Sequence, residues 1–284
     1  MLYEVYLDAI RNREQKLSKF KDNSQDKIFS EASSRWIIYY PSPRIGISVG
    51  VDSSWNKRSF QGFDLYVVDA VAVTSDNTIL ERRWNDDIGV INEEQLKYKA
   101  MSMEAIVADH SAEWADIISV DGSLISRFIK HKRETIFEII NVIKNHDNII
   151  FISKTSDSTT QFNSFKPIAA DIYYYNHIGQ CPGFSIPIEN QDYSNYTSVI
   201  EIYARLKEYT PIIKIDIPRK KGSDVKEGDI KELLNILSFH SVAGYPYCLK
   251  LAHENCKINS EDIARLSSIY GLTQETQSRD ALNE

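Results

Sequence analysis

Cysteine is scarce in this sequence, and long apolar runs are missing. The three cysteines, Cys181, Cys248 and Cys256, are scattered and lack the spacing of a metal site or a disulfide framework. An odd set of this kind is typical of a reducing compartment, so we expect a cytoplasmic protein. No apolar run approaches the ~20 residues that span a bilayer, so we expect no membrane association.

Internal repeats, low-complexity tracts and linkers are absent as well. With 284 residues, 42% hydrophobic and 26% charged, the composition is that of an ordinary globular chain. We expect one domain over 1–284, with an N-terminal helix (1–30), a core (44–155), its continuation (156–258), and a C-terminal helix and tail (259–284). The first segment mixes acidic residues into its apolar positions, which is typical of an amphipathic helix and not of a signal peptide.

Acidic residues outnumber basic ones, and the net charge is −7. A global sum says little about a local groove, however, and basic residues cluster in 127–133 and 205–221. Each cluster is compatible with a solvated face and with a nucleic-acid groove, and the sequence leaves both open.

The apolar pattern predicts a mixed sheet. Strands are predicted over 44–52, 63–75 and 78–86, with a hairpin turn at Asp76-Asn77. Asn92 is a plausible N-cap for a following helix. A strand (117–120), a helix (134–145) and a strand (148–153) come next. Three antiparallel strands followed by helix-linked parallel strands predict an RNase H-like α/β fold.

Three carboxylates accompany this order: Asp52 at the end of the first strand, Glu104 on the helix, and Asp121 at the end of the fourth strand. In an RNase H-like sheet the first and fourth strands are parallel neighbours, so both aspartates would emerge together. Crowded acids repel one another unless a cation neutralises them. Hard oxygen ligands suit Mg²⁺ or Mn²⁺, and two such ions ~4 Å apart can activate water against a phosphodiester.

A second signal lies near the C-terminus. Gly244-Tyr245-Pro246 predicts a tight turn that opens a helix, and His253 follows Tyr245 by about two helical turns. A lone histidine on such a helix is more often structural, although a further metal ligand would look the same.

Together these segments resemble motifs of the NurA nuclease family. The matching segments are GVDSS with Asp52, MEAIVADH with Glu104, ISVDGSL with Asp121, and GYPYCLKLAH with Tyr245 and His253. The similarity covers most of the chain, and GYP…LAH combined with VDGS is its more specific part. Ser53-Ser54 stands where the family commonly has a glycine-serine pair, which leaves the aspartate intact.

The resemblance implies Mn²⁺-dependent cleavage of DNA, with Mg²⁺ as the other possible ion. It implies 5′-to-3′ exonuclease activity on single- and double-stranded DNA and endonuclease activity on single strands. It also implies a homodimer that acts with a hexameric HerA-type translocase in DNA end resection for recombinational repair in archaea. By position, Asp52, Glu104, Asp121 and His253 would bind the metal, and Tyr245 would contact the scissile phosphate or the DNA.

Further residues are hypotheses only. Lys154, just after a predicted strand, and Arg219 in the second basic cluster are placed to contact the DNA backbone. Tyr173–Tyr175 would stack on bases if exposed, but buried aromatics are the favoured interpretation.

Two other functions remain as alternatives. One is a non-catalytic DNA-end adaptor of the same fold, although all three acids are present. The other is an actin-like ATPase, but this class needs two such repeats and the second half does not resemble the first.

Overall fold

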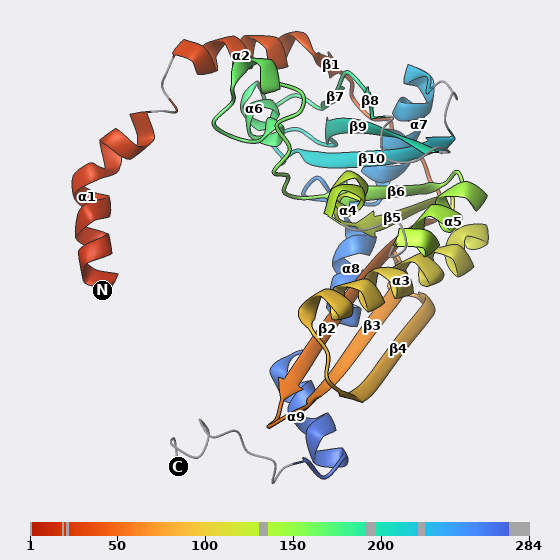
Figure 1. Ribbon diagram of the computed structural model, residues 1–284. Coiled ribbons are helices and arrows are strands. Elements are labelled where there is room, and N and C mark those ends of the chain that lie inside the picture. The colour runs from red at the N-terminus through yellow and green to blue at the C-terminus, as the bar shows by residue number, and fades with distance from the viewer. Residues whose placement is uncertain are drawn as a thin grey trace.

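Figure 1 shows the computed structural model of the chain, which describes residues 2–18, 20, 23–130, 136–190, 197–220 and 225–272. Within these ranges no helix combines the length and the apolar character needed to cross a membrane. The predicted C-terminal tail beyond residue 272 and residues 131–133 of the cluster 127–133 lie outside the described residues.

The strands lie as follows: β1 (Trp36–Ile38), β2 (Ser48–Ser59), β3 (Asp64–Thr74), β4 (Ile79–Gly89), β5 (Ile117–Asp121), β6 (Ile149–Ser153), β7 (Gly183–Ser185), β8 (Ile188–Asn190), β9 (Thr197–Arg205), β10 (Ile213–Lys220), β11 (Ser241–Val242) and β12 (Tyr245–Pro246). The helices are α1 (Leu2–Ser18), α2 (Asn23–Ser34), α3 (Glu93–Ser111), α4 (Leu124–Lys130), α5 (Phe137–Asn145), α6 (Asp171–His177), α7 (Glu227–Phe239), α8 (Tyr247–Cys256) and α9 (Ser260–Ile269), with 3₁₀ turns at η2 (Ala112–Trp114) and η4 (Asn163–Phe165).

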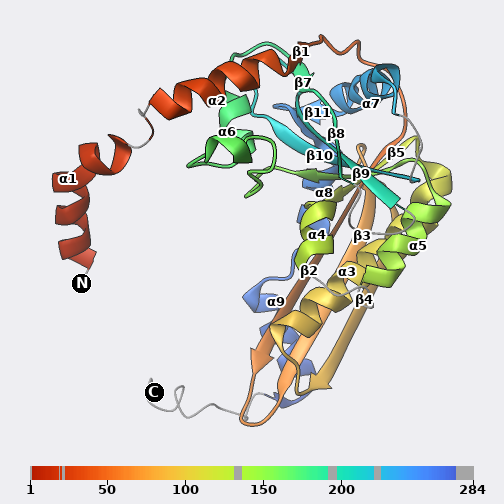
Figure 2. The same ribbon diagram turned by 45° about the horizontal axis from the view of Figure 1, so that its top comes forward.

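One mixed sheet organises the described part of the chain, in the order β1-β7-β9-β10-β6-β5-β2-β3-β4, with β8 also paired to β9. β2, β3 and β4 are antiparallel, while β5 is parallel to both β2 and β6. The predicted RNase H-like order is therefore confirmed. The sequence did not predict that β10, β9, β7 and β1 would extend the sheet beyond β6 (Figure 2).

The first strand is longer than predicted. We expected it to end at Asp52, but β2 continues to Ser59 because β3 pairs with it along its whole length. Its parallel pairing with β5 covers only residues 48–51. Asp52 is therefore the first residue of β2 beyond its pairing with β5. It lies at the carboxyl edge of these two parallel strands, where the site was predicted.

The helix after the antiparallel strands begins as predicted. Asn92 accepts a hydrogen bond from the Gln95 backbone N–H, and the Gln95 side chain accepts one from the Asn92 N–H, so a capping box starts α3. The helix predicted over 134–145 is observed as α5 (Phe137–Asn145), and the first two residues of the predicted range lie outside the described part of the chain.

Side chains alternate across the sheet and build a core on each face. On β5 and β6, Ile118 and Phe151 pack with α3 and α5, whereas Ile117 and Ile152 pack with α7 and α8. Figure 1 shows the same layering, with α3 and α5 in front of the sheet and α8 behind it. Consecutive residues on a strand therefore face different helices.

The N-terminal segment forms two helices where one was predicted. α1 buries none of its residues, and it stands apart from the sheet in both views (Figures 1 and 2). α2 instead packs against α6, where Ile28 joins a cluster with Tyr174 and Tyr175. Those two tyrosines are fully buried, which confirms the structural interpretation of the tyrosine run.

The second basic cluster is not a uniform solvated face. Arg205 is buried and donates to the backbone carbonyls of Asn176, Gly179 and Thr210. Lys214 is also buried. Both side chains are buried and bind partners within the protein, so neither is available to a nucleic acid.

Candidate active site

Asp121 is the last residue of β5 and stands at the carboxyl edge of the sheet. The chain then turns sharply at Gly122, whose φ of +94° is a conformation that glycine adopts without strain. Ser123 caps the following helix, because its hydroxyl accepts a hydrogen bond from the Ser126 N–H at 3.2 Å. Asp121, Gly122 and Ser123 therefore form a sharp turn between β5 and α4.

Asp52 faces α8 and meets His253 there. His253 Nδ1 lies 2.9 Å from Asp52 Oδ2, and an ionised carboxylate requires that Nδ1 carry the proton and donate it. Gly50, two residues earlier on the same face, makes this approach possible. A Cβ at Gly50 would lie 2.3 Å from the backbone carbon of Cys248 on α8.

Glu104 approaches from the opposite face of the sheet. Ser53, which points toward α3, donates to Glu104 Oε1 at 2.5 Å. Arg127 Nη1 lies 2.6 Å from Glu104 Oε2 as an ion pair, although the angle is outside that of an aligned hydrogen bond. A second nitrogen of Arg127 donates to the Asp121 carbonyl oxygen at 2.7 Å, so one guanidinium joins two of the predicted site residues.

The three carboxylates are close enough to influence one another. Burial, together with the charges of Glu104 and Asp121, raises the pKa of Asp52 to about 6. Each carboxylate nevertheless has its own partner: His253, Arg127 or Tyr245. Among the described residues, no three His, Cys, Asp or Glu side chains already surround one point at ligand distance.

Tyr245 completes the group from the β11–β12 hairpin. Its hydroxyl donates to Asp121 Oδ1 at 3.0 Å. Burial and then the charge of Asp121 raise the pKa of Tyr245 far above its ordinary value, so the hydroxyl keeps its proton. Lys154 Nζ lies 4.3 Å from the centre of the Tyr245 ring, which is a cation–π distance. The structure thus brings Lys154 to the edge where Asp121 stands.

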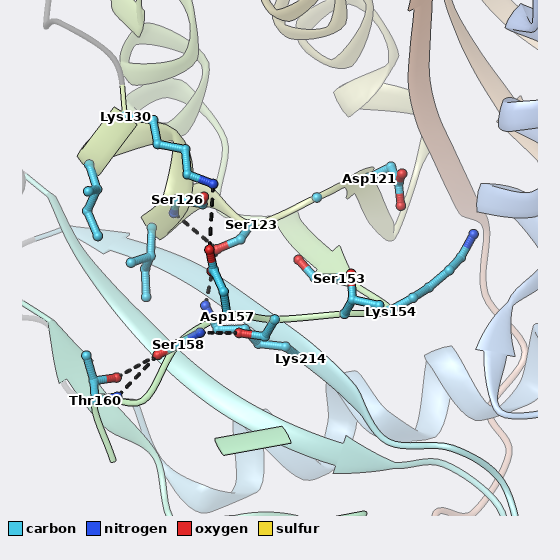
Figure 3. Close-up of a pocket in the computed structure, with 15 residues that line it drawn as sticks. Asp121, Ser123, Ser126, Lys130, Ser153, Lys154, Asp157, Ser158, Thr160 and Lys214 are labelled. Carbon is cyan, nitrogen blue, oxygen red and sulfur yellow. Dashed lines mark hydrogen bonds and ion pairs between the residues drawn. The ribbon is translucent and has the colours of Figure 1, made fainter. Parts of the chain in front are cut away.

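A pocket of about 730 Å³ opens beside Asp121. Hydroxyl groups and lysines dominate its lining; among them are Ser123, Ser126, Lys130, Ser153, Lys154, Thr155, Ser156, Ser158, Thr160 and Lys214. Figure 3 shows Asp121 and Lys154 on one side of this pocket and Lys130 with Asp157 across from them. Lysines on two sides of the cavity suit a phosphate-containing chain.

Sequence reasoning missed a buried ion cluster under this pocket. Lys214 Nζ lies 2.9 Å from Asp216 Oδ1 and 3.0 Å from Glu201 Oε2. Asp216 Oδ2 accepts from the Ser123 hydroxyl at 2.6 Å and from the Ile125 N–H, which fixes the turn after Asp121. Burial works against the charge of Lys214, but its two acidic partners outweigh burial and raise its pKa.

Arg127 was also not predicted as a site residue. The signal was present only as a basic residue six positions after Asp121, in a cluster with no other sign of function. Arg219, in contrast, is not brought to the site. It lies at the opposite edge of the sheet, near the start of β6, where it donates to the Asp147 carbonyl oxygen at 3.1 Å.

These features define an RNase H-like α/β protein whose acidic residues meet at the carboxyl edge of two adjacent parallel strands. The NurA domain family matches residues 47–258, about three quarters of the sequence, and the chain belongs to this family.

Individual relatives agree over nearly their full length. The DNA double-strand break repair nuclease NurA of Saccharolobus solfataricus is 24% identical over 319 residues, covering 93% of this chain and 92% of the relative. That of Sulfurisphaera tokodaii is 21% identical and covers 96% of both.

Solved structures share the fold. The crystal structure of the NurA nuclease from Sulfolobus solfataricus superposes with a TM-score of 0.80 at 20% identity, covering 96% of this chain and 97% of that one. A crystal structure of NurA bound to dAMP and manganese has a TM-score of 0.64 at 13% identity, covering 98% and 99%.

Proposed function

We propose that this protein is a metal-dependent DNA nuclease that acts in double-strand break repair. The observation that carries the proposal is the convergence of Asp52, Asp121 and Glu104 at one sheet edge, beside a hydroxyl- and lysine-lined pocket. Family membership supports the same activity, since the relatives are named as nucleases. One relative has been crystallised with both manganese and a nucleotide.

The residues fit a divalent cation. Burial and the nearby charges of Glu104 and Asp121 raise the pKa of Asp52, and a bound cation would offset both effects. Glu104 Oε2 is a buried oxygen with no aligned hydrogen bond. We propose Asp52, Asp121 and His253 as ligands of Mn²⁺ or Mg²⁺, with Glu104 as a further ligand whose carboxylate Arg127 now holds. When bound, the metal supplies Lewis acidity and lowers the pKa of a water that attacks phosphorus.

Hydrogen bonds and a nearby lysine orient these ligands and supply positive charge. His253 orients Asp52 through Nδ1, and its Nε2 is the nitrogen left for a ligand or a proton. The Tyr245 hydroxyl holds Asp121 and keeps its own proton, so we assign it positioning and not base chemistry. Lys154 offers a charge to a phosphate at the mouth of the pocket.

The test is cleavage of end-labelled DNA with Mn²⁺ by the wild type, Asp52→Asn and Asp121→Asn. Asp26→Asn, an exposed aspartate on α2, is the matched control. We expect both site variants to lose at least roughly 100-fold in rate while the control is unchanged. Full activity in Asp121→Asn would place the site elsewhere. DNA binding without cleavage by the wild type would favour the end-adaptor alternative.

We propose further that cleavage is exonucleolytic in the 5′-to-3′ direction on single- and double-stranded DNA, and endonucleolytic on single strands. Family resemblance supports this proposal. The test compares 5′- and 3′-labelled duplexes and a circular single strand. Release of mononucleotides from the 3′ end alone would contradict the proposed polarity.

We propose that the protein is a homodimer that works with a hexameric HerA-type translocase. The exposed apolar side chains of α1, among them Leu2, Tyr6 and Ile10, support a protein contact there. Light scattering should give twice the chain mass, falling to the chain mass in a Tyr6→Glu/Ile10→Glu variant. A monomeric wild type would contradict this proposal without affecting the nuclease assignment.

A further inference from the structure

A second pocket lies on the other side of Tyr245. It has a volume of about 440 Å³ and is lined mainly by apolar groups, including Pro211, Ile213 and Val242. Tyr245 and Tyr247 add aromatic surface to the same lining. The pocket beside Asp121 differs in having seven serine or threonine residues in its lining, whereas this one has none.

Tyr245 and Lys154 connect the two pockets. The hydroxyl of Tyr245 bonds to Asp121, while its ring forms part of the apolar wall. Lys154 lines both pockets and lies over that ring. Lys250, a second exposed cation, lines the apolar pocket and lies 5.7 Å from the centre of the Tyr247 ring. Only the side chain of Tyr245 would thus separate a group bound in the apolar pocket from Asp121 in the proposed active site.

We propose that this pocket binds one nucleobase of the DNA strand, from a nucleotide that flanks the scissile phosphate. The proposal rests on the nuclease function proposed above. A base is the only part of a DNA strand with large apolar faces, and aromatic rings stack on any base without regard to sequence. Lys154 and Lys250 supply the charge for the phosphates on either side of it.

The hairpin that forms one wall is held in place. Ala243 and Gly244 at its tip both have positive φ, and a Cβ at Gly244 would lie 2.3 Å from the Thr210 hydroxyl oxygen. This close packing fixes the wall against the loop that precedes β10. A base can enter a preformed slot only after it leaves the helical stack, so cleavage should prefer single-stranded or frayed ends.

The experiment uses Val242, an exposed pocket residue 59% accessible to solvent. Val242→Trp fills the pocket, and Val90→Trp, the same substitution at an exposed valine outside the pocket lining, is the matched control. Each protein is assayed with Mn²⁺ on single strands that carry one abasic site, moved stepwise across the cleavage position. Binding is followed separately without metal, by the fluorescence of 2-aminopurine placed at the same positions.

We expect the wild type and Val90→Trp to cleave one abasic substrate roughly tenfold more slowly than ordinary DNA. Val242→Trp should cleave both at the same reduced rate and lose the 2-aminopurine response. Equal cleavage of all abasic substrates by the wild type, with ordinary DNA still cut, would overturn the base pocket alone. A protein that cuts no DNA, yet gives the position-specific fluorescence response, would retain the pocket and overturn the nuclease proposal.

Discussion

His253 Nδ1 lies 2.9 Å from Asp52 Oδ2, although 201 positions separate the two residues in the chain. The contact exists because α8 packs directly on β2, with Gly50 leaving room for the backbone of Cys248. A carboxylate held by a histidine in this way is oriented before any metal or substrate arrives.

Gly50→Ala should separate this pair. The added methyl group would overlap the α8 backbone at 2.3 Å, so we expect a loss of about 1–3 kcal/mol in the free energy of unfolding and a fall in nuclease rate. Gly89→Ala is the control, because a Cβ there meets nothing within 4 Å. Urea unfolding and the cleavage assay measure both effects. If Gly50→Ala has the free energy of unfolding of the wild type, α8 can move away from β2 without destabilising the protein.

Arg127→Met should destabilise the protein through Glu104. The two side chains are 12% and 7% exposed, so the substitution leaves a buried carboxylate without its cation, at about 3–5 kcal/mol. Adding Glu104→Gln removes the stranded charge and should restore most of that loss in denaturant unfolding. If the double variant is no more stable than Arg127→Met, the ion pair is not the source of the effect.

Tyr245→Phe removes only the hydroxyl that donates to Asp121. We expect kcat for DNA cleavage to fall roughly 10- to 100-fold, since the carboxylate loses the donor that orients it. KM should change little, because the ring still lines the apolar pocket. Tyr209→Phe, at an exposed tyrosine, is the control. A change confined to KM would mean that the hydroxyl binds DNA instead of positioning Asp121.

Asp171 should make stability depend on pH. Burial raises its pKa to about 6 from the ordinary 3.8, so between these values the folded state binds more protons than the unfolded state. The free energy of unfolding attributable to this group therefore falls as pH rises from about 4 to 6, by roughly 2–3 kcal/mol, and is constant above.

Asp171→Asn keeps an oxygen to accept the Gln161 N–H but cannot ionise. The difference in unfolding free energy between wild type and variant, measured in urea from pH 4 to 7, should follow that fall. A difference that is flat across this window would contradict the raised pKa.

The sequence by itself determined the elements that depend on local chemistry. Continuous runs of apolar, β-prone residues predicted β3 and β5, Asn92 as an N-cap predicted the start of α3, and Asp-Gly-Ser favours the turn after Asp121. The order of these elements was enough to predict the strand order in the first half of the sheet. Crossovers between parallel strands are right-handed, and this rule leaves few possible topologies.

Only the tertiary structure decided which partner each acidic group meets. Asp52 and Ser53 are neighbours in the chain but face opposite sides of the sheet, so one meets His253 and the other Glu104. The sequence marked Arg127 and Lys214 only as members of basic clusters, and it did not mark the apolar pocket at all. They depend on contacts between side chains that are distant in the chain, and a local pattern holds no information about the packing that brings such side chains together.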